Sequence, residues 1–157
     1  MASSHIYPGA HTLNPYIVIK GCSDAIEFYI NAFGAIERGR LMMPDGTIAH
    51  AEVEIEGSLL MMSDENLEWG SIGPHAIGGN PMTFGLYVMD ADAVIQRAVD
   101  AGATLTRPVE DQFYGDRTGQ ILDPFGYKWM ITTHKEDVSF EEMQKRSDQL
   151  FGGSEVK

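Results

Sequence analysis

The sequence predicts an α+β fold made of two successive βαβββ modules and a C-terminal helix. Two observations support this prediction: a helix that repeats at a fixed spacing, and short β-rich runs on both sides of each copy. The 157 residues suffice for one domain with a sizeable core. We expect a single domain over residues 1–157, with modules at about 13–65 and 81–134, a linker at about 66–80 and a helix at about 139–151.

The repeat is clearest in two amphipathic helices. The first is predicted at 24–33, where Ser23 is a suitable N-cap and apolar residues recur at helical spacing. Asp90 or Asp92 caps the second. Equivalent positions of the two helices lie 68 residues apart: Ile26 and Val94, Ile30 and Ala98, Gly34 and Gly102. This constant offset indicates that the same supersecondary unit occurs twice.

Extended segments surround both helices. One β-rich run precedes each helix, at 16–19 and 84–88. Three further runs follow each helix, at 36–43, 48–55 and 58–63 and then at 104–109, 118–122 and 127–133. Turn sequences such as Asp45-Gly46 separate them. After the last run, Ser139 and Glu142 have the spacing of a capping box, which predicts the C-terminal helix.

Composition narrows the function classes. The formal net charge is -12 and the basic residues form no stripe, so neither nucleic acid nor an anionic membrane is an expected partner. No apolar run approaches the roughly 20 residues of a membrane helix. The single cysteine, Cys22, excludes an intramolecular disulfide. We therefore expect a cytoplasmic protein.

Three sequence strings resemble those of the glyoxalase/bleomycin-resistance/extradiol-dioxygenase superfamily, also called vicinal oxygen chelate proteins, and of its PhnB-like branch. They are Met43–Glu52 (MPDGTIAHAE), Asp111–Gly119 (DQFYGDRTG) and Asp123–Trp129 (DPFGYKW). The resemblance implies that the mixed sheets curl into a cup with the helices outside and a small organic ligand inside. It also implies a homodimer, commonly with exchanged halves.

Metal-dependent members of this superfamily carry His or Glu/Gln ligands on the concave face of the sheet. The resemblance places the ligand positions near Asn14, within the strand of His50 and Glu52, at Thr83 and at Met130. Only His50 and Glu52 are good ligands for the divalent metals of this superfamily. We therefore expect no cofactor, with a divalent metal held by His50 and Glu52 as the alternative.

Strand alternation selects further candidates for a ligand-binding site. Tyr16, His50, Glu52 and Tyr87 all point away from the helix-facing side of their strands, so they are predicted to line the cup. His50 also suits a general base, because its reference pKa lies near neutrality. The two tyrosines serve equally well as packing residues.

The loop before the seventh expected strand supplies three more candidates. Phe113, Tyr114 and Arg117 form an aromatic and cationic group that suits a planar or anionic ligand. Arg117 has a structural alternative, which is to pair with one of the many carboxylates. These two interpretations of Arg117 stay open at this point.

Three functions are compatible with these residues. The first is a metal-independent small-molecule binding protein with a dimeric cup, in the way that bleomycin-resistance proteins sequester a drug. The alternative is a metal-dependent lyase, isomerase or dioxygenase of the same superfamily that uses His50 and Glu52, or an enzyme that uses His50 alone as a base. The third is a structural role in which side chains fill the cup. Whether the chain is an enzyme is left open.

Overall fold

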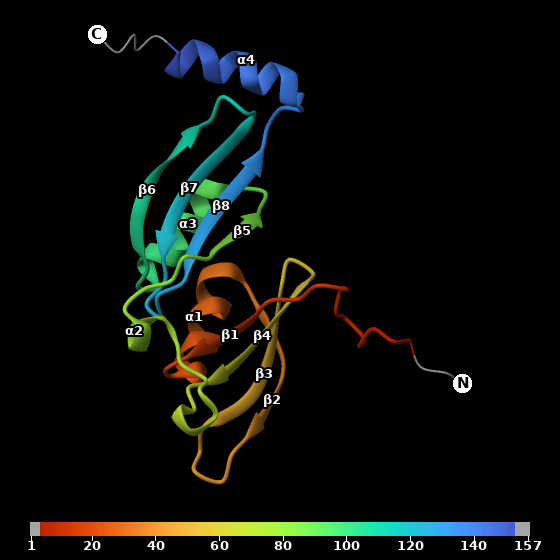
Figure 1. Ribbon diagram of the computed structural model, residues 1–157, viewed down its shortest axis with the longest axis vertical. Helices are drawn as coiled ribbons and strands as arrows, with labels where there is room; N and C mark the ends of the chain where they lie inside the picture. Colours follow the sequence, from red (N-terminus) through yellow and green to blue (C-terminus); the bar gives the residue numbers. More distant parts are fainter. Residues whose placement is uncertain (1–3, 153–157) are drawn as a thin grey trace.

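The computed structural model describes residues 4–152 and consists of two modules stacked along its long axis, with a helix at the far end (Figure 1). The first module contains β1 (Tyr16–Ile19), α1 (Cys22–Phe33), β2 (Ile36–Met42), β3 (Ile48–Ile55) and β4 (Ser58–Asp64). The second contains β5 (Thr83–Tyr87), α3 (Ala91–Asp100), β6 (Thr104–Asp111), β7 (Asp116–Leu122) and β8 (Lys128–His134). Helix α4 (Phe140–Phe151) follows.

Each module builds its own four-stranded mixed sheet. The strand orders are β1-β4-β3-β2 and β5-β8-β7-β6, and the two sheets share no strand pairing within the described residues. In each sheet the first strand pairs in parallel with the last, and all other pairs are antiparallel. The predicted α+β fold of two βαβββ modules with a C-terminal helix is therefore confirmed.

The core lies between the helices and one face of each sheet. Along β3, buried Ala51, Val53 and Ile55 alternate with partly exposed His50 and Glu52, so one face meets α1 and the other is open. On β8 of the second sheet, buried Trp129 and Ile131 likewise flank exposed Met130, and α1 packs against α3 where the modules meet. The opposite face of each sheet is not covered by α1 or α3.

Helix α1 begins one residue before the predicted N-cap. Ser23 does not cap it, because the helix starts at Cys22 and Gly21 precedes it in a left-handed conformation with φ 86°. The carboxylate of Asp64, at the end of β4, takes the place of a cap. It accepts hydrogen bonds from the backbone N–H groups of Gly21, Cys22 and Ile48 at 3.1, 2.8 and 2.7 Å. A residue distant in sequence therefore satisfies the helix start.

The other two helices that the sequence predicts, α3 and α4, begin after the predicted capping residues. Asp90 caps α3 by accepting from the N–H of Ala93, and Ser139 caps α4 by accepting from the N–H of Glu142. The segment predicted as a linker is partly helical, with a 3₁₀ turn (Leu67–Trp69) and the short helix α2 (Pro74–Ile77). Within residues 4–152, no helix combines the length and the apolar character needed to cross a membrane.

A buried carboxylate joins the two modules. Asp123 is only 2% exposed, and one of its oxygens accepts from the hydroxyl of Tyr29 on α1 at 2.8 Å and from Nε1 of Trp129 on β8 at 2.9 Å. The other oxygen accepts from the N–H groups of Phe125 and Tyr127, both at 2.9 Å. Burial raises the pKa of Asp123, and these hydrogen bonds offset part of that shift. Tyr29 belongs to the first module, so the interaction fixes one module against the other.

Candidate functional site

Tyr16, His50 and Glu52 form a hydrogen-bonded row on the open face of the first sheet. Nε2 of His50 lies 3.1 Å from Oε1 of Glu52, and Nδ1 lies 3.3 Å from the hydroxyl oxygen of Tyr16. The ring centroids of Tyr16 and His50 are 5.6 Å apart. The structure thus brings together three residues that the sequence predicts as ligand-binding, one from β1 and two from β3.

The carboxylate of Glu52 sets the direction of one hydrogen bond in the row. A carboxylate only accepts, so Nε2 of His50 donates to Glu52, and in the tautomer that carries its proton on Nε2, Nδ1 is left to accept from the hydroxyl of Tyr16. A carboxylate that holds an imidazole in one tautomer orients it as a general base. The side chain of His50 is 36% exposed, so a ligand on the open face can reach it. Chemically, the row is suited to taking up and releasing a proton.

The same row does not fit a divalent metal within one chain. Metal centres of this kind use three or four protein ligands, and His50 and Glu52 supply only two. Asn14 is engaged with nearby backbone, and Met130 lies on the other sheet. Across residues 4–152, His, Cys, Asp and Glu side chains form no group of three that is placed to hold one ion. We therefore derive no metal-dependent chemistry for this site.

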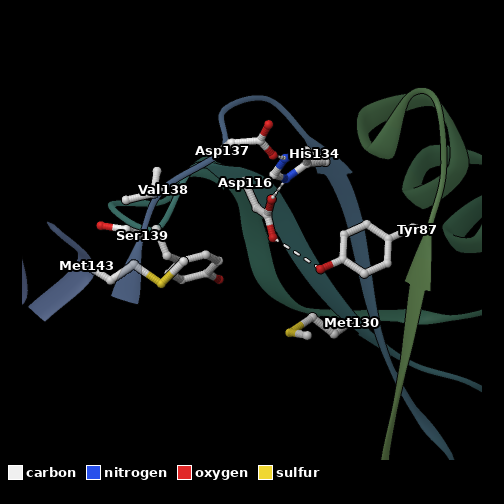
Figure 2. A pocket seen from close by; sticks show the side chains of 9 residues that line it. Tyr87, Asp116, Met130, His134, Asp137, Val138, Ser139 and Met143 are labelled. Carbon is white, nitrogen blue, oxygen red and sulfur yellow. Dashed lines mark hydrogen bonds and ion pairs between the residues drawn. The ribbon is translucent and has the colours of Figure 1, made fainter. Parts of the chain in front are cut away.

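A larger pocket lies on the open face of the second sheet, against the start of α4. Its volume is about 600 Å³. Figure 2 shows Tyr87 on one side of it, Val138, Ser139 and Met143 on the other, and Met130 at its lower edge. The pocket is lined by Tyr87, Tyr114, Asp116, Met130, His134, Asp137, Val138, Ser139 and Met143. We call this space the α4 pocket.

The polar groups of the α4 pocket are bonded to one another. Nδ1 of His134 lies 2.7 Å from Oδ1 of Asp116, and Nε2 lies 2.8 Å from Oδ1 of Asp137 (Figure 2). Hydrogen bonds to Asp116 and then to Asp137 raise the pKa of His134, which favours its imidazolium form. The hydroxyl of Tyr87 points at Oδ2 of Asp116 from 3.5 Å, and the negative charge of Asp116 raises the pKa of Tyr87.

The remaining predicted site residues have different positions. Tyr87 and Tyr114 both line the α4 pocket. Phe113 lies beside it and packs edge-on against Tyr114 and Phe151, with ring centroids 5.3 and 6.1 Å apart. Arg117 is not in the pocket lining. Its guanidinium bonds Asp92 on α3 and Asp111 on β6, which is the structural alternative.

Sequence reasoning missed most of the α4 pocket. His134 is not among the predicted site residues, yet the structure places it between two carboxylates. The pairing of Asp116 with His134 in the β7–β8 ladder is the signal that finds it, because paired residues face the same side of a sheet. Met143 is not among the predicted site residues either. In the structure it lines the pocket, because the cap at Ser139 fixes where α4 begins.

Comparison with known proteins places this chain among sequence relatives. A family model described as Glyoxalase/Bleomycin resistance protein/Dioxygenase superfamily matches residues 10–131. A Mycobacterium tuberculosis protein, "Uncharacterized protein Rv0887c", is 41% identical over 135 residues, which cover 84% of this chain and 79% of the relative. "Protein YjdN" of Escherichia coli is 30% identical over 150 residues, with coverage of 79% and 96%.

A solved structure extends the likeness to three dimensions. The X-ray structure of the Arabidopsis thaliana gene product At5g48480 aligns with a TM-score of 0.63 and 29% identity, covering 77% of this chain and 97% of that chain. The family model spans most of the chain, and the relatives are similar over most of their own length. The chain therefore belongs to the Glyoxalase/Bleomycin resistance protein/Dioxygenase superfamily.

Proposed function

We propose that this chain binds a small organic molecule in the α4 pocket and that binding requires no metal. The observation that carries the proposal is the pocket itself, whose volume of about 600 Å³ lies in the range of small-molecule sites. It combines apolar walls with a few polar groups at fixed positions, which is the usual composition of such sites. Its position on the open sheet face also matches the ligand side that the superfamily resemblance implies.

The walls of the pocket come from three separate elements. Met130 projects from β8, Tyr87 projects from β5, and Met143 comes from the first turns of α4. Thioethers and aromatic rings adapt to ligands of different shape and contact them with large apolar areas. The carboxylates, the imidazole and the phenols supply hydrogen-bond donors and acceptors directly, so a ligand is held without an intervening ion.

We propose a second candidate function, proton-transfer catalysis by His50, because the Tyr16–His50–Glu52 row orients the imidazole as a base. The substrate would lie on the open face of the first sheet and lose a proton to Nδ1 of His50 after displacing the hydroxyl of Tyr16. This candidate corresponds to the predicted alternative in which an enzyme uses His50 alone as a base. Binding in the α4 pocket ranks above it, because that pocket has a ligand-sized volume and His50 does not line it.

We also propose that the working unit is a homodimer. The open faces and their edges expose large apolar side chains, including Leu41 and Met42 in the first module and Tyr87 and Met130 in the second. A second copy that covers these faces would enclose both sites in a cup and bury this apolar area. Sedimentation equilibrium tests the dimer. Membership of the PhnB-like branch likewise stays a prediction.

A ligand screen on pocket-blocked variants tests the main proposal. Chelator-treated protein is screened against small organic molecules by thermal shift, and hits are repeated on Met130→Trp and Met89→Trp. Both methionines are exposed, at 40% and 98%, but only Met130 lines the α4 pocket. We expect Met130→Trp to weaken binding at least about tenfold, because a bulky ring occupies the ligand volume, and Met89→Trp to leave it unchanged.

The same screen separates the two candidates. Hits that bind both tryptophan variants equally and are lost in His50→Ala place the ligand on the first sheet and contradict the α4 pocket proposal. Elemental analysis of untreated protein for Zn, Ni, Mn and Fe accompanies the screen. Stoichiometric metal that disappears in His50→Ala would overturn the metal-independent proposal.

A further inference from the structure

The charges that line the α4 pocket are unbalanced. Asp116 and Asp137 are two carboxylates, and His134 is the one lining residue whose side chain becomes positively charged on protonation. No Lys or Arg lines the pocket. Even with His134 protonated, one negative charge is left over. The whole chain adds to this field, since its formal net charge is -12.

Two arginines near the pocket are paired with carboxylates outside its lining. Arg117 bonds Asp92 and Asp111, away from the pocket lining. Arg146, on α4, bonds Glu136 and Glu142 and the backbone carbonyl of Phe113. Lys135 borders a neighbouring cavity that also contains Asp116 and Glu136, but it is not part of the α4 pocket lining. A ligand in the α4 pocket therefore meets the carboxylates directly, with no Lys or Arg side chain in the lining.

Asp116 is the carboxylate best placed to act on a ligand. Its side chain is only 12% exposed, whereas that of Asp137 is fully exposed. Oδ1 of Asp116 is hydrogen-bonded to Nδ1 of His134, but the distance from Oδ2 to the hydroxyl of Tyr87 is long, at 3.5 Å. Oδ2 therefore retains accepting capacity toward the pocket. Partial burial strengthens its attraction for a positive charge relative to an exposed carboxylate.

The aromatic walls favour the same kind of ligand. Tyr87 and Tyr114 both border the pocket, and aromatic faces attract cations that sit within about 6 Å of the ring. The sulfur atoms of Met130 and Met143 and the side chain of Val138 provide an apolar surface beside them. Figure 2 shows Asp116 between Tyr87 on one side of the pocket and Val138, Ser139 and Met143 on the other. A carboxylate, aromatic rings and an apolar floor thus converge on one space.

We propose that the α4 pocket binds an organic cation, namely a protonated amine or quaternary ammonium carried on an apolar body. The cation lies between Asp116 and the ring of Tyr87, and the apolar body lies against Met130 and Met143. This assignment rests on the proposed function, because it specifies the ligand class of the same pocket. The assignment adds a charge requirement to the proposed function. Neutral and anionic ligands of the same shape are expected to bind less tightly than the cation.

Three isosteric probes test the charge requirement. They are the cation (3-hydroxyphenyl)trimethylammonium, its neutral analogue 3-tert-butylphenol, and the anion 3-hydroxybenzenesulfonate. Binding is followed on the full chain by the methyl NMR signals of Met130 and Met143 and by calorimetry. We expect the cation to bind about tenfold more tightly than the neutral analogue, and the anion to bind more weakly than both.

Variants assign that preference to the pocket carboxylates. Asp116→Asn is expected to bring the cation and the neutral analogue to within about twofold of each other, whereas Asp100→Asn, on the exposed side of α3, keeps the tenfold difference. Asp137→Asn gives a smaller reduction, and its exposed side chain makes it a safe second variant if Asp116→Asn fails to fold. Circular dichroism checks folding of each variant.

The outcomes separate the ligand class from the proposed function. A neutral analogue that binds as tightly as the cation, with shifts at Met130 and Met143, overturns the cation assignment and leaves binding in the pocket intact. A preference for the cation that survives both Asp116→Asn and Asp137→Asn also overturns the assignment. If none of the three probes shifts either methionine signal, the cation assignment is refuted. The library hits on Met130→Trp then decide the proposed function separately.

Discussion

Replacing Asp123 by Asn tests whether the buried carboxylate holds the two modules together. Four donors converge on Asp123: the hydroxyl of Tyr29, Nε1 of Trp129 and the N–H groups of Phe125 and Tyr127. An amide has one accepting oxygen and a donating NH₂ group. If its oxygen serves the two backbone groups, Tyr29 can turn to accept, but Trp129 cannot, so one buried N–H is left without a partner.

The expected magnitude follows from that count. An orphaned buried donor costs about 1–3 kcal/mol, and the hydrogen bonds that remain lose the assistance of the charge. Burial raises the pKa of Asp123, so neutralising it recovers part of the desolvation cost and limits the loss. We expect the free energy of unfolding to fall by about 2–4 kcal/mol. With a urea m-value of about 2 kcal/mol/M, the midpoint falls by about 1–2 M.

Urea unfolding followed by tryptophan fluorescence and by circular dichroism measures this loss. Asp100→Asn is the control, because its carboxylate lies on the exposed surface of α3 and accepts only from Gln96. That variant is expected to change the free energy of unfolding by less than about 0.5 kcal/mol. A midpoint for Asp123→Asn within about 0.3 M of the unchanged protein would refute the role given to this carboxylate.

Three further predictions test separate parts of the molecule. Asp64→Ala removes the acceptor for three backbone N–H groups at the starts of α1 and β3, so urea unfolding should show a loss of about 2 kcal/mol; a loss below about 0.5 kcal/mol would mean that water replaces this cap. Gly119→Ala would place a Cβ 2.5 Å from Cδ1 of Ile95 and should lower the free energy of unfolding by about 1–3 kcal/mol, whereas the Cβ of Gly39→Ala meets nothing within 4 Å and should be neutral or stabilising. Thermal melts compare the two variants, and equal melting temperatures would contradict the close packing of α3 on β7. Because the pKa of His134 is raised in the folded protein, its contribution to stability is present below the unfolded pKa of about 6.5 and is lost as pH rises through the folded pKa. An NMR titration of the imidazole measures the folded pKa, and a His134→Gln variant with the same pH dependence of unfolding would contradict the assignment.

The parts of the fold that the sequence predicts well depend on the local periodicity of polar and apolar residues. The alternation of polar and apolar residues along β3 predicts that His50 and Glu52 share the open face, and they do. The side-chain period of a strand is a local property, so no knowledge of the partners is needed. The same reasoning places Tyr16 and Tyr87 on open faces, where the structure has them 48% and 64% exposed.

Capping at α1 shows where local reasoning fails. Ser23 has the right side chain and position for a cap, but the carboxylate of Asp64 from β4 already accepts from the first N–H groups. A cap can come from any residue that the fold brings to the helix start, and that choice is made by tertiary contacts. The two open interpretations of Arg117 are separated in the same way, because Asp92 on α3 meets it only after α3 packs on the sheet.

The sequence by itself determined the repeat, the strand faces and the residues of the Tyr16–His50–Glu52 row, because each of these depends on spacing along the chain. Its resemblance to the superfamily rests on three short sequence strings. Only the tertiary structure decided that Asp116, His134 and Met143 surround one pocket. Those residues come from β7, the end of β8 and α4, and they meet through the register of the β7–β8 ladder and the direction in which α4 leaves the sheet. Both are set by long-range packing that no local sequence pattern encodes.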